Sequence, residues 1–364
     1  MTRRNVLFHI SGHGYGHAAR SAEVIRALRR HAHVGEVHVR TRAPAWLIQE
    51  TAGHDVPVHP VALDAGVMEQ DPLTIDVGGT LRRARELVGQ RRALVEQEVR
   101  ALRALNVALV VADIPWLAGE VAEAAGVPCV ALGNFTWDWI YAGYQATHPE
   151  FVEVMEAARA GYARMSCWLR LPFHHAAHAF PRVHDVPLIV RQRSRSAADT
   201  LQALGIPSHD ARPRILLGLR GGVDDDTVRR ALQSAPDLLF ISATPTTLAA
   251  PNLAVPASSS GLTFTDLLGV SRVALSKLGY GTVAEAMASG VAVLWPRRTG
   301  FPEDAIFDAE LSRHLAHAEI PRADFRAGHW APHLRRLVEL PAPPRTLALD
   351  GAEHCARFLG GLLR

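Results

Sequence analysis

Residues 273–296 read VALSKLGYGTVAEAMASGVAVLWP. The segment begins with a β-rich run, continues through a glycine turn and a helical run, and ends with a second β-rich run. The first β-rich run ends at Ser276, and Gly279 and Gly281 give the turn its backbone freedom. Thr282 then opens the helix, whose unpaired amides and positive dipole end favour an anion. Units of this kind assemble into parallel sheets. The segment predicts an α/β domain that binds a phosphate-bearing ligand.

Two charged side chains flank this turn. Lys277 is the single lysine among the 39 Lys and Arg residues of the chain. Its ammonium, the Thr282 hydroxyl and the helix N-terminus together would cradle a diphosphate. Glu285 lies one turn into the helix, where it could accept hydrogen bonds from both hydroxyls of a ribose. The simpler alternative is an ordinary capped helix in which Glu285 complements the dipole.

The same alternation of strands and helices continues in both directions. We expect strands at 5–10, 36–41, 107–113, 128–133, 215–218, 238–242, 273–276 and 291–295. We expect helices at 18–31, 80–105, 118–125, 224–233, 282–288, 304–318 and 352–363. The pattern predicts an N-terminal domain over 1–190, a second domain over 191–345, and a C-terminal helix in 346–364 that packs back on the first domain. A cleft between two such α/β halves is the expected ligand site.

A second glycine loop, SGHGYGHAAR at residues 11–20, follows the first predicted strand. The spacing of Gly12, Gly14 and Gly16 does not meet the G-x-G-x-x-G pattern of dinucleotide binding. His13 and His17 flank the loop at a strand edge, where an imidazole can take a proton from a hydroxyl near neutral pH. Alternatively, each histidine only hydrogen-bonds the turn.

Asp113 ends the buried run LVVAD, which places its carboxylate at the same edge of the sheet. There it could orient a histidine and stabilise its charged form. It could equally cap the helix that follows Pro115.

Composition excludes several classes of protein. Hydrophobic residues make up 48% and charged residues 21% of 364, which is typical of a globular protein. The net charge of +3, without a basic stripe interleaved with aromatics, gives no indication of nucleic-acid binding. No apolar run approaches the roughly 18 residues of a membrane span. Three widely spaced cysteines argue against a disulfide scaffold, so we expect a cytoplasmic protein.

Metal ligands and aromatic residues give weaker signals. His174 and His178 would share one helix face but lack a zincin carboxylate, so we expect no metal site. The segment TWDWIYAGY, 136–144, is the densest aromatic cluster. It either packs in the core or lines an acceptor pocket. The candidate pocket residues are Trp137, Asp138 and Tyr141.

The stretch from Ser276 to Glu285 resembles the donor-binding motif of GT-B glycosyltransferases. That resemblance implies that Lys277 and Thr282 face the donor diphosphate, beside Gly279 and Gly281, and that Glu285 faces the ribose. The sequence GVAVLWPRRTGFPED resembles the strand and acidic tail that meet the donor sugar. This likeness implicates Glu303 and Asp304. The family usually has a glutamine directly after the acidic residue, and this sequence has none there.

Two loops resemble further parts of the same enzymes. The sequence GLRGG resembles a phosphate-side loop of the second domain and implicates Arg220 as a donor contact. GYGHAARS resembles the Gly-His loop of the inverting members. The resemblance implies that His13, Gly14 and Gly16 lie next to the donor. In those members the histidine is the base and an Asp pairs with it, which here implicates His17 and Asp113.

A closer resemblance covers nearly the whole chain. GHGYGHAAR, DAGVMEQDPLTID, GNFTWDWIYAGY and KLGYGTVAEA resemble the glycosyltransferase-like N-terminal region of L-arabinokinase-type proteins. The UDP-glycosyltransferases and the peptidoglycan N-acetylglucosaminyltransferases are more distantly similar. These resemblances imply an α/β protein of the GT-B fold, with two Rossmann-like domains facing across a cleft.

The resemblance also implies a reaction. A sugar would pass from a nucleotide-diphosphate donor, UDP-linked, to a hydroxyl acceptor without a cofactor or metal ion. Retaining GT-B enzymes commonly carry two Glu residues eight apart; here Lys277 stands eight residues before Glu285, which favours inversion. The alternatives are a non-catalytic nucleotide-sugar sensor and a sugar-nucleotide epimerase of related fold.

Overall fold

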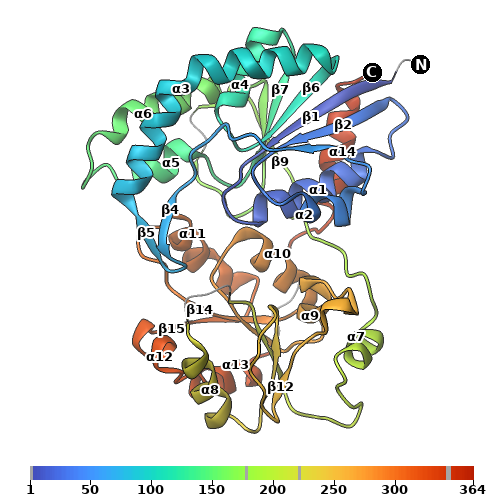
Figure 1. The fold of residues 1–364 in the computed structure, drawn as a ribbon, viewed down its shortest axis with the longest axis vertical. Coiled ribbons are helices and arrows are strands. Elements are labelled where there is room, and N and C mark those ends of the chain that lie inside the picture. The colour runs from blue at the N-terminus through green and yellow to red at the C-terminus, as the bar shows by residue number, and fades with distance from the viewer. Residues whose placement is uncertain (1–2, 177–178, 220–222, 342–345) are drawn as a thin grey trace.

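The computed structural model describes residues 3–176, 179–219, 223–341 and 346–364 (Figure 1). Two parallel sheets lie in separate halves of the molecule. The first sheet has the order β3 (Val58–His59), β2 (Val34–Arg40), β1 (Arg4–Ile10), β6 (Val107–Asp113), β7 (Cys129–Gly133), β8 (Cys167–Arg170) and β9 (Val183–Asp185). From β1 the next strands along the chain lie on one side of the sheet, and from β6 onward they lie on the other. The carboxyl ends of β1 and β6 therefore form a topological switch point, which is where open α/β sheets bind ligands.

Both faces of the first sheet are covered by helices. Side chains alternate across a strand, so Val6 and Phe8 belong to one buried cluster and Leu7 to another. The first cluster includes α1 (Gly16–Leu28), α2 (Ala45–Ala52) and the C-terminal α14 (Gly351–Gly361), which packs on α1. The second includes α3 (Val77–Ala104), α4 (Leu117–Ala125), α5 (Trp137–Ala142) and α6 (Phe151–Ala163).

The second sheet is also parallel. Its order is β12 (Leu253–Ala254), β11 (Leu239–Ser242), β10 (Arg214–Leu217), β13 (Val273–Leu275), β14 (Ala292–Pro296) and β15 (His317–Ile320). The helices of this half are α7 (Ala197–Ala203), α8 (Asp225–Ser234), α9 (Phe264–Gly269), α10 (Tyr280–Ser289), α11 (Glu303–Glu310), α12 (Arg322–Ala327) and α13 (Ala331–Glu339). Short 3-10 turns lie at Ser258–Ser260 and Leu311–Arg313.

The predicted helix over 304–318 is wrong in its second part. The structure ends α11 at Glu310 and places the edge strand β15 from His317. Ala316, Ala318 and Ile320 alternate along this segment and pack into the core beneath α13. The alternation of buried residues has the period of a strand, and the segment forms backbone hydrogen bonds with the edge of β14 instead of a helix.

The start of α10 also needs correction. The helix begins at Tyr280 with Gly279 as its N-cap, two residues before the predicted start at Thr282. Gly281 is therefore helical, and Thr282 lies inside the first turn. This position still leaves Thr282 among the amides that carry the positive end of the dipole.

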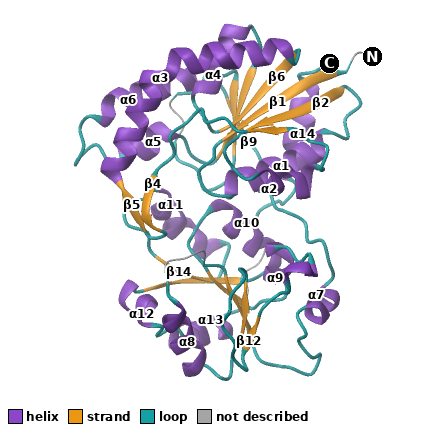
Figure 2. Ribbon diagram, in the orientation of Figure 1, coloured by secondary structure: helices purple, strands orange, loops and turns teal. Residues whose placement is uncertain are grey.

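An antiparallel hairpin, β4 (Met68–Asp71) and β5 (Thr74–Asp76), reaches from the first half to the second (Figure 2). The Ile75 amide donates to the Thr299 carbonyl at 3.2 Å, and the Thr299 amide donates to the Leu73 carbonyl at 2.7 Å. The hairpin thereby joins the second half through backbone hydrogen bonds. Among the described residues, no helix has the length and apolar character needed to cross a membrane.

Candidate active site

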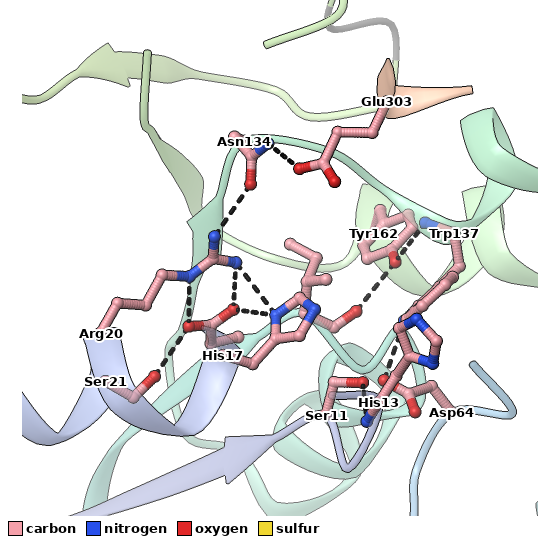
Figure 3. A network of polar contacts seen from close by, with 12 residues as sticks. Ser11, His13, His17, Arg20, Ser21, Asp64, Asn134, Trp137, Tyr162 and Glu303 are labelled. Carbon is pink, nitrogen blue, oxygen red and sulfur yellow. Dashed lines mark hydrogen bonds and ion pairs between the residues drawn. The ribbon is translucent and has the colours of Figure 1, made fainter. Parts of the chain in front are cut away.

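The loop after β1 and the end of β6 meet because β1 and β6 are neighbouring parallel strands, with Ile10 opposite Asp113. His17 lies in the first turn of α1 and points back toward β6 (Figure 3). Its Nδ1 is 2.8 Å from Oδ1 of Asp113, and both side chains are buried. The structure therefore brings together the histidine and the aspartate that the family resemblance predicted as a pair.

Asp113 is further held by the next turn of α1. Arg20 donates from Nε to Oδ2 at 2.8 Å and from Nη2 to Oδ1 at 2.6 Å, and the Ser21 hydroxyl donates to Oδ2 at 2.8 Å. Burial works to raise the pKa of Asp113, but the charges and hydrogen bonds of Arg20 and His17 outweigh it and lower this pKa to about 2. Asp113 is therefore a carboxylate that only accepts hydrogen bonds.

That charge state sets the tautomer of His17. A carboxylate cannot donate, so the 2.8 Å contact requires the proton on Nδ1 of His17. Arg20 Nη2 lies 3.0 Å from the same nitrogen because both groups bind one oxygen of Asp113. In a neutral imidazole that carries its proton on Nδ1, Nε2 is the nitrogen that can accept a proton, which is what a general base requires.

Sequence reasoning missed Arg20. Its signal was available, because His17, Arg20 and Ser21 are spaced three and four residues apart on a predicted helix. An arginine on the same face as a candidate base indicates a charge partner for a nearby carboxylate.

A cavity of about 310 Å³ lies near this dyad: His17 and Asp113 are not in its wall, but the wall residues His13 and Asp64 both interact electrostatically with His17. Its wall combines the first glycine loop and other residues of the first half with one residue of the second half, Lys277: Gly12, His13, Gly14, Arg42, Ala62, Asp64, Ala65, Val67, Met68, Glu69, Arg83 and Lys277. Gly14 has a φ of 67°, a conformation that favours glycine. The predicted residues His13, Gly14 and Lys277 thus share one cavity.

His13 forms part of the cavity wall and stacks on Phe301, with ring centroids 6.0 Å apart. Burial lowers the pKa of His13 to about 3, helped by the neighbouring charges of His17, Lys277, Arg298 and Arg83. His13 is therefore neutral at physiological pH and adds no charge to the cavity.

The aromatic candidates lie behind the cavity. Trp137 and Tyr141 are fully buried; Trp137 Nε1 donates to Asp64 Oδ2 at 2.8 Å, and the Tyr141 hydroxyl donates to the Gly66 carbonyl at 3.0 Å. Asp138 accepts from Arg159 at 3.1 Å. These positions match the core alternative better than direct lining of a pocket.

Lys277 reaches across the cleft to the hairpin. Its Nζ lies 3.1 Å from Oε1 of Glu69, and the lysine side chain is 40% exposed. The two glycine loops face each other at the same place, since a Cβ added to Gly281 would lie 3.8 Å from Cα of Gly16. Thr282 follows Gly281 in the first turn of α10. The predicted diphosphate residues therefore lie at the junction of the two halves.

Glu285 already has a cationic partner. Arg191, from the segment that links the two halves, donates from Nε to Oε1 at 2.5 Å and from Nη2 to Oε2 at 3.1 Å. Burial raises the pKa of Glu285, although Arg191 opposes this shift. The carboxylate assigned to ribose thus forms a bidentate ion pair that sequence reasoning did not foresee.

The two acids of the predicted sugar-binding tail also have partners. Arg298 donates from Nε to Asp304 Oδ1 at 2.8 Å and lies 3.4 Å from Glu303 Oε2. Glu303 Oε1 accepts from Nδ2 of Asn134 at 2.8 Å, and Asn134 Oδ1 accepts from Arg20 at 2.8 Å (Figure 3). A buried chain of hydrogen bonds therefore connects the dyad to the second half.

Two earlier candidates cannot be placed. Arg220 and His178 lie outside the described residues. Across the ranges that the structure describes, no three His, Cys, Asp or Glu side chains cluster in a way that could hold a metal ion.

Comparison with known proteins agrees with this architecture. The chain is 31% identical to L-arabinokinase of Arabidopsis thaliana over 355 residues, which cover 97% of this chain and 34% of that protein. It therefore spans about a third of the length of its relative and is similar to that part of it. No family model matches the chain.

Solved structures give the fold. The glycotransferase of kitacinnamycin has a TM-score of 0.63 at 15% identity, covering 100% of this chain and 97% of that one. Other glycosyltransferases share the fold. A protein named as a UDP-N-acetylglucosamine 2-epimerase, from Listeria monocytogenes, has a TM-score of 0.56 at 12% identity, over 99% and 95% of the two chains. The chain has the GT-B fold, as the sequence predicted, and it is related to the L-arabinokinase region.

Proposed function

We propose that this protein transfers a sugar from a nucleotide-diphosphate donor to a hydroxyl acceptor, with inversion at the anomeric carbon. The observation that carries the proposal is the buried His17–Asp113 pair at 2.8 Å, beside a cavity that both halves line. The UDP-linked donor is part of the proposal. So is a cytoplasmic location, with which the three unpaired, buried cysteines are compatible.

In the proposed reaction His17 acts first on the acceptor. Its Nε2 takes the proton of the acceptor hydroxyl while that oxygen attacks the anomeric carbon. The bond from this carbon to the diphosphate oxygen breaks, and the electron pair leaves with the nucleoside diphosphate. Asp113 stabilises the imidazolium that forms, and Arg20 keeps Asp113 ionised. General base catalysis of this kind is worth about 10²–10⁴-fold.

The second half holds the leaving group in this proposal. Lys277, the Thr282 hydroxyl and the first amides of α10 offset the charge of the diphosphate. Glu285 accepts from the ribose once Arg191 shifts from it, and Glu303 and Asp304 face the donor sugar. We propose that these groups replace a metal ion, so EDTA is expected to leave turnover unchanged.

A second candidate is epimerisation of a sugar nucleotide, because a protein named for that activity shares the fold. Fold alone does not separate the two reactions. Both reactions can use a base, because epimerisation removes a proton from carbon; only transfer requires an acceptor hydroxyl, so dependence on an acceptor separates the two. A nucleotide-sugar sensor would bind the donor and turn nothing over.

Donor binding is tested by titrating nucleoside diphosphates into the protein in a calorimeter. Lys277→Ala is expected to weaken affinity for UDP at least tenfold, which is about 1.4 kcal/mol. Arg326→Ala is the matched control, because Arg326 pairs with Asp71 of the same hairpin at 3.4 Å and lies away from the cavity wall. Unchanged affinity in Lys277→Ala would remove the donor assignment.

A further inference from the structure

We infer that the cavity beside His17 binds a small acceptor that carries an anionic group, such as a phosphorylated or carboxylated sugar. The inference rests on the proposed transfer reaction and adds the chemical class of the acceptor. It depends on the size of the cavity, on two arginines in its wall and on the position of Asp64.

Size limits the acceptor. At about 310 Å³ the cavity lies at the lower end of the range for small-molecule sites. The hairpin supplies one wall through Met68 and Glu69, and its backbone bonds to Thr299 fix that wall against the second half. A single sugar ring with one substituent suits this space, whereas a polymer or a large lipophilic aglycone does not.

Charge selects an anion. Arg42 and Arg83 line the cavity and are both exposed, and neither has a carboxylate partner among the ion pairs of the described residues; Nη1 of Arg83 lies 3.5 Å from the Met68 sulfur. Of the other charged wall residues, Lys277 pairs with Glu69, His13 is neutral, and the positive charge of Arg83 opposes the effect of burial on the pKa of Asp64. A planar guanidinium binds a carboxylate or a phosphate through two parallel hydrogen bonds, so these two arginines fit an anionic substituent.

Asp64 supplies the other end of the site. Its carboxylate is buried in the wall, where it accepts from Trp137 at 2.8 Å, and burial raises its pKa. A buried carboxyl group of this kind can accept a hydrogen bond from a sugar hydroxyl. The rings of His13 and His17 both contact Trp137, with centroids 5.5 and 6.3 Å away. A hydroxyl held near Asp64 would therefore lie at the entrance to the catalytic pair.

Arg42→Gln, Arg83→Gln and the double variant test the inference. Arg82→Gln is the matched control, because Arg82 is the exposed neighbour of Arg83 on α3 and does not line the cavity. Binding is measured by calorimetry with glucose 6-phosphate, glucuronate, glucose and UDP.

We expect glucose 6-phosphate or glucuronate to bind the wild type at least tenfold more tightly than glucose does. Arg42→Gln and Arg83→Gln should each lose about tenfold of that affinity, Arg82→Gln should keep it, and UDP should bind all five proteins alike. The inference is overturned if neither anionic sugar binds the wild type, if glucose binds equally well, or if the arginine variants bind as the wild type does.

The arginines could instead serve the donor. In that case Arg42→Gln and Arg83→Gln would weaken UDP and leave the anionic sugars unchanged, which would also overturn the inference. Failure of the donor assignment gives a different result, because UDP would then be insensitive to Lys277→Ala while the anionic sugars stay sensitive to the arginines.

Discussion

Asp113 is the residue on which the catalytic arrangement depends. It accepts hydrogen bonds from His17, Arg20 and Ser21, all on the first two turns of α1. Breaking a buried ion pair from one side leaves the other charge without compensation. The aspartate therefore has a structural effect through Arg20 and a chemical effect through His17, and the two can be separated by experiment.

Asp113→Asn should lower turnover at least 100-fold and lower the free energy of unfolding by about 3–5 kcal/mol. The affinity for UDP, measured by calorimetry, should stay within about twofold of the wild-type value. Such binding would show that the variant is folded. Ser21→Ala is the control, because it removes one hydrogen bond to Asp113, worth about 1 kcal/mol, without touching His17. Normal turnover in Asp113→Asn would contradict the assigned role.

A second buried histidine predicts how stability depends on pH. His9 lies in β1, its Nε2 is 3.8 Å from Glu98 Oε2, and neither ring nitrogen has a hydrogen-bond partner among the described residues. Burial, followed by the charge of Arg40, lowers the pKa of His9 to about 3 from 6.5. Below pH 6.5 the unfolded chain takes up a proton that the folded chain refuses, so stability falls as pH falls toward 3.

Between pH 7 and pH 5 this single group should remove about 2 kcal/mol of stability. His9→Leu should therefore lose about 2 kcal/mol less than the wild type over that interval, as measured by urea unfolding at each pH. An equal loss in the two proteins would show that His9 is not buried in its neutral form.

The sequence could predict His17 and Asp113 together because both follow β-rich runs, and parallel strands end at one edge. It could not predict the partners of Lys277 or Glu285. Glu69 and Arg191 are 208 and 94 residues away along the chain, and their ion pairs depend on how the two halves dock. Local spacing carries no information about such contacts.

At the scale of elements, the β4–β5 hairpin is the feature with the clearest consequence. Lys277 would bind a diphosphate in the proposed reaction, yet without ligand its ammonium pairs with Glu69 of β4. An incoming diphosphate has to replace this carboxylate. The hairpin therefore sets part of the cost of donor binding.

Glu69→Gln should raise the affinity for UDP up to about fivefold, because exposed ion pairs are worth about 0–1 kcal/mol. Asp71→Asn is the control on the same hairpin: it removes the pair with Arg326, the asparagine Oδ1 can still accept from the Leu73 amide, and the affinity for UDP should not change. Weaker UDP binding by Glu69→Gln in calorimetry would show that Glu69 supports the donor instead of competing with it.

Elements with strong periodicity were predicted well, and β6 matches its predicted range of 107–113. The hairpin did not emerge as an element, because β4 and β5 are only four and three residues long and are stabilised by contacts with Thr299. The predicted helix extends to residue 318, into the segment that forms β15, because the pairing of that segment with β14 is not visible in local sequence.

At the scale of the whole molecule, the site exists only where the halves meet. In the proposed reaction the first half supplies the base and most of the cavity wall, and the second supplies Lys277 and the start of α10. The path from Asp113 through Arg20 and Asn134 to Glu303 connects them by buried hydrogen bonds. Docking of the halves and assembly of the site are therefore the same event.

The central claim is inverting sugar transfer by His17, and NMR of the reaction product tests it most directly. The wild type is incubated with α-linked UDP-, GDP- and dTDP-sugars, each with and without glucose 6-phosphate or glucuronate. The account predicts a β-linked product that requires the acceptor and is lost in His17→Ala, while UDP affinity is kept. An α-linked product, an epimerised donor formed without acceptor, or normal turnover by His17→Ala would contradict it.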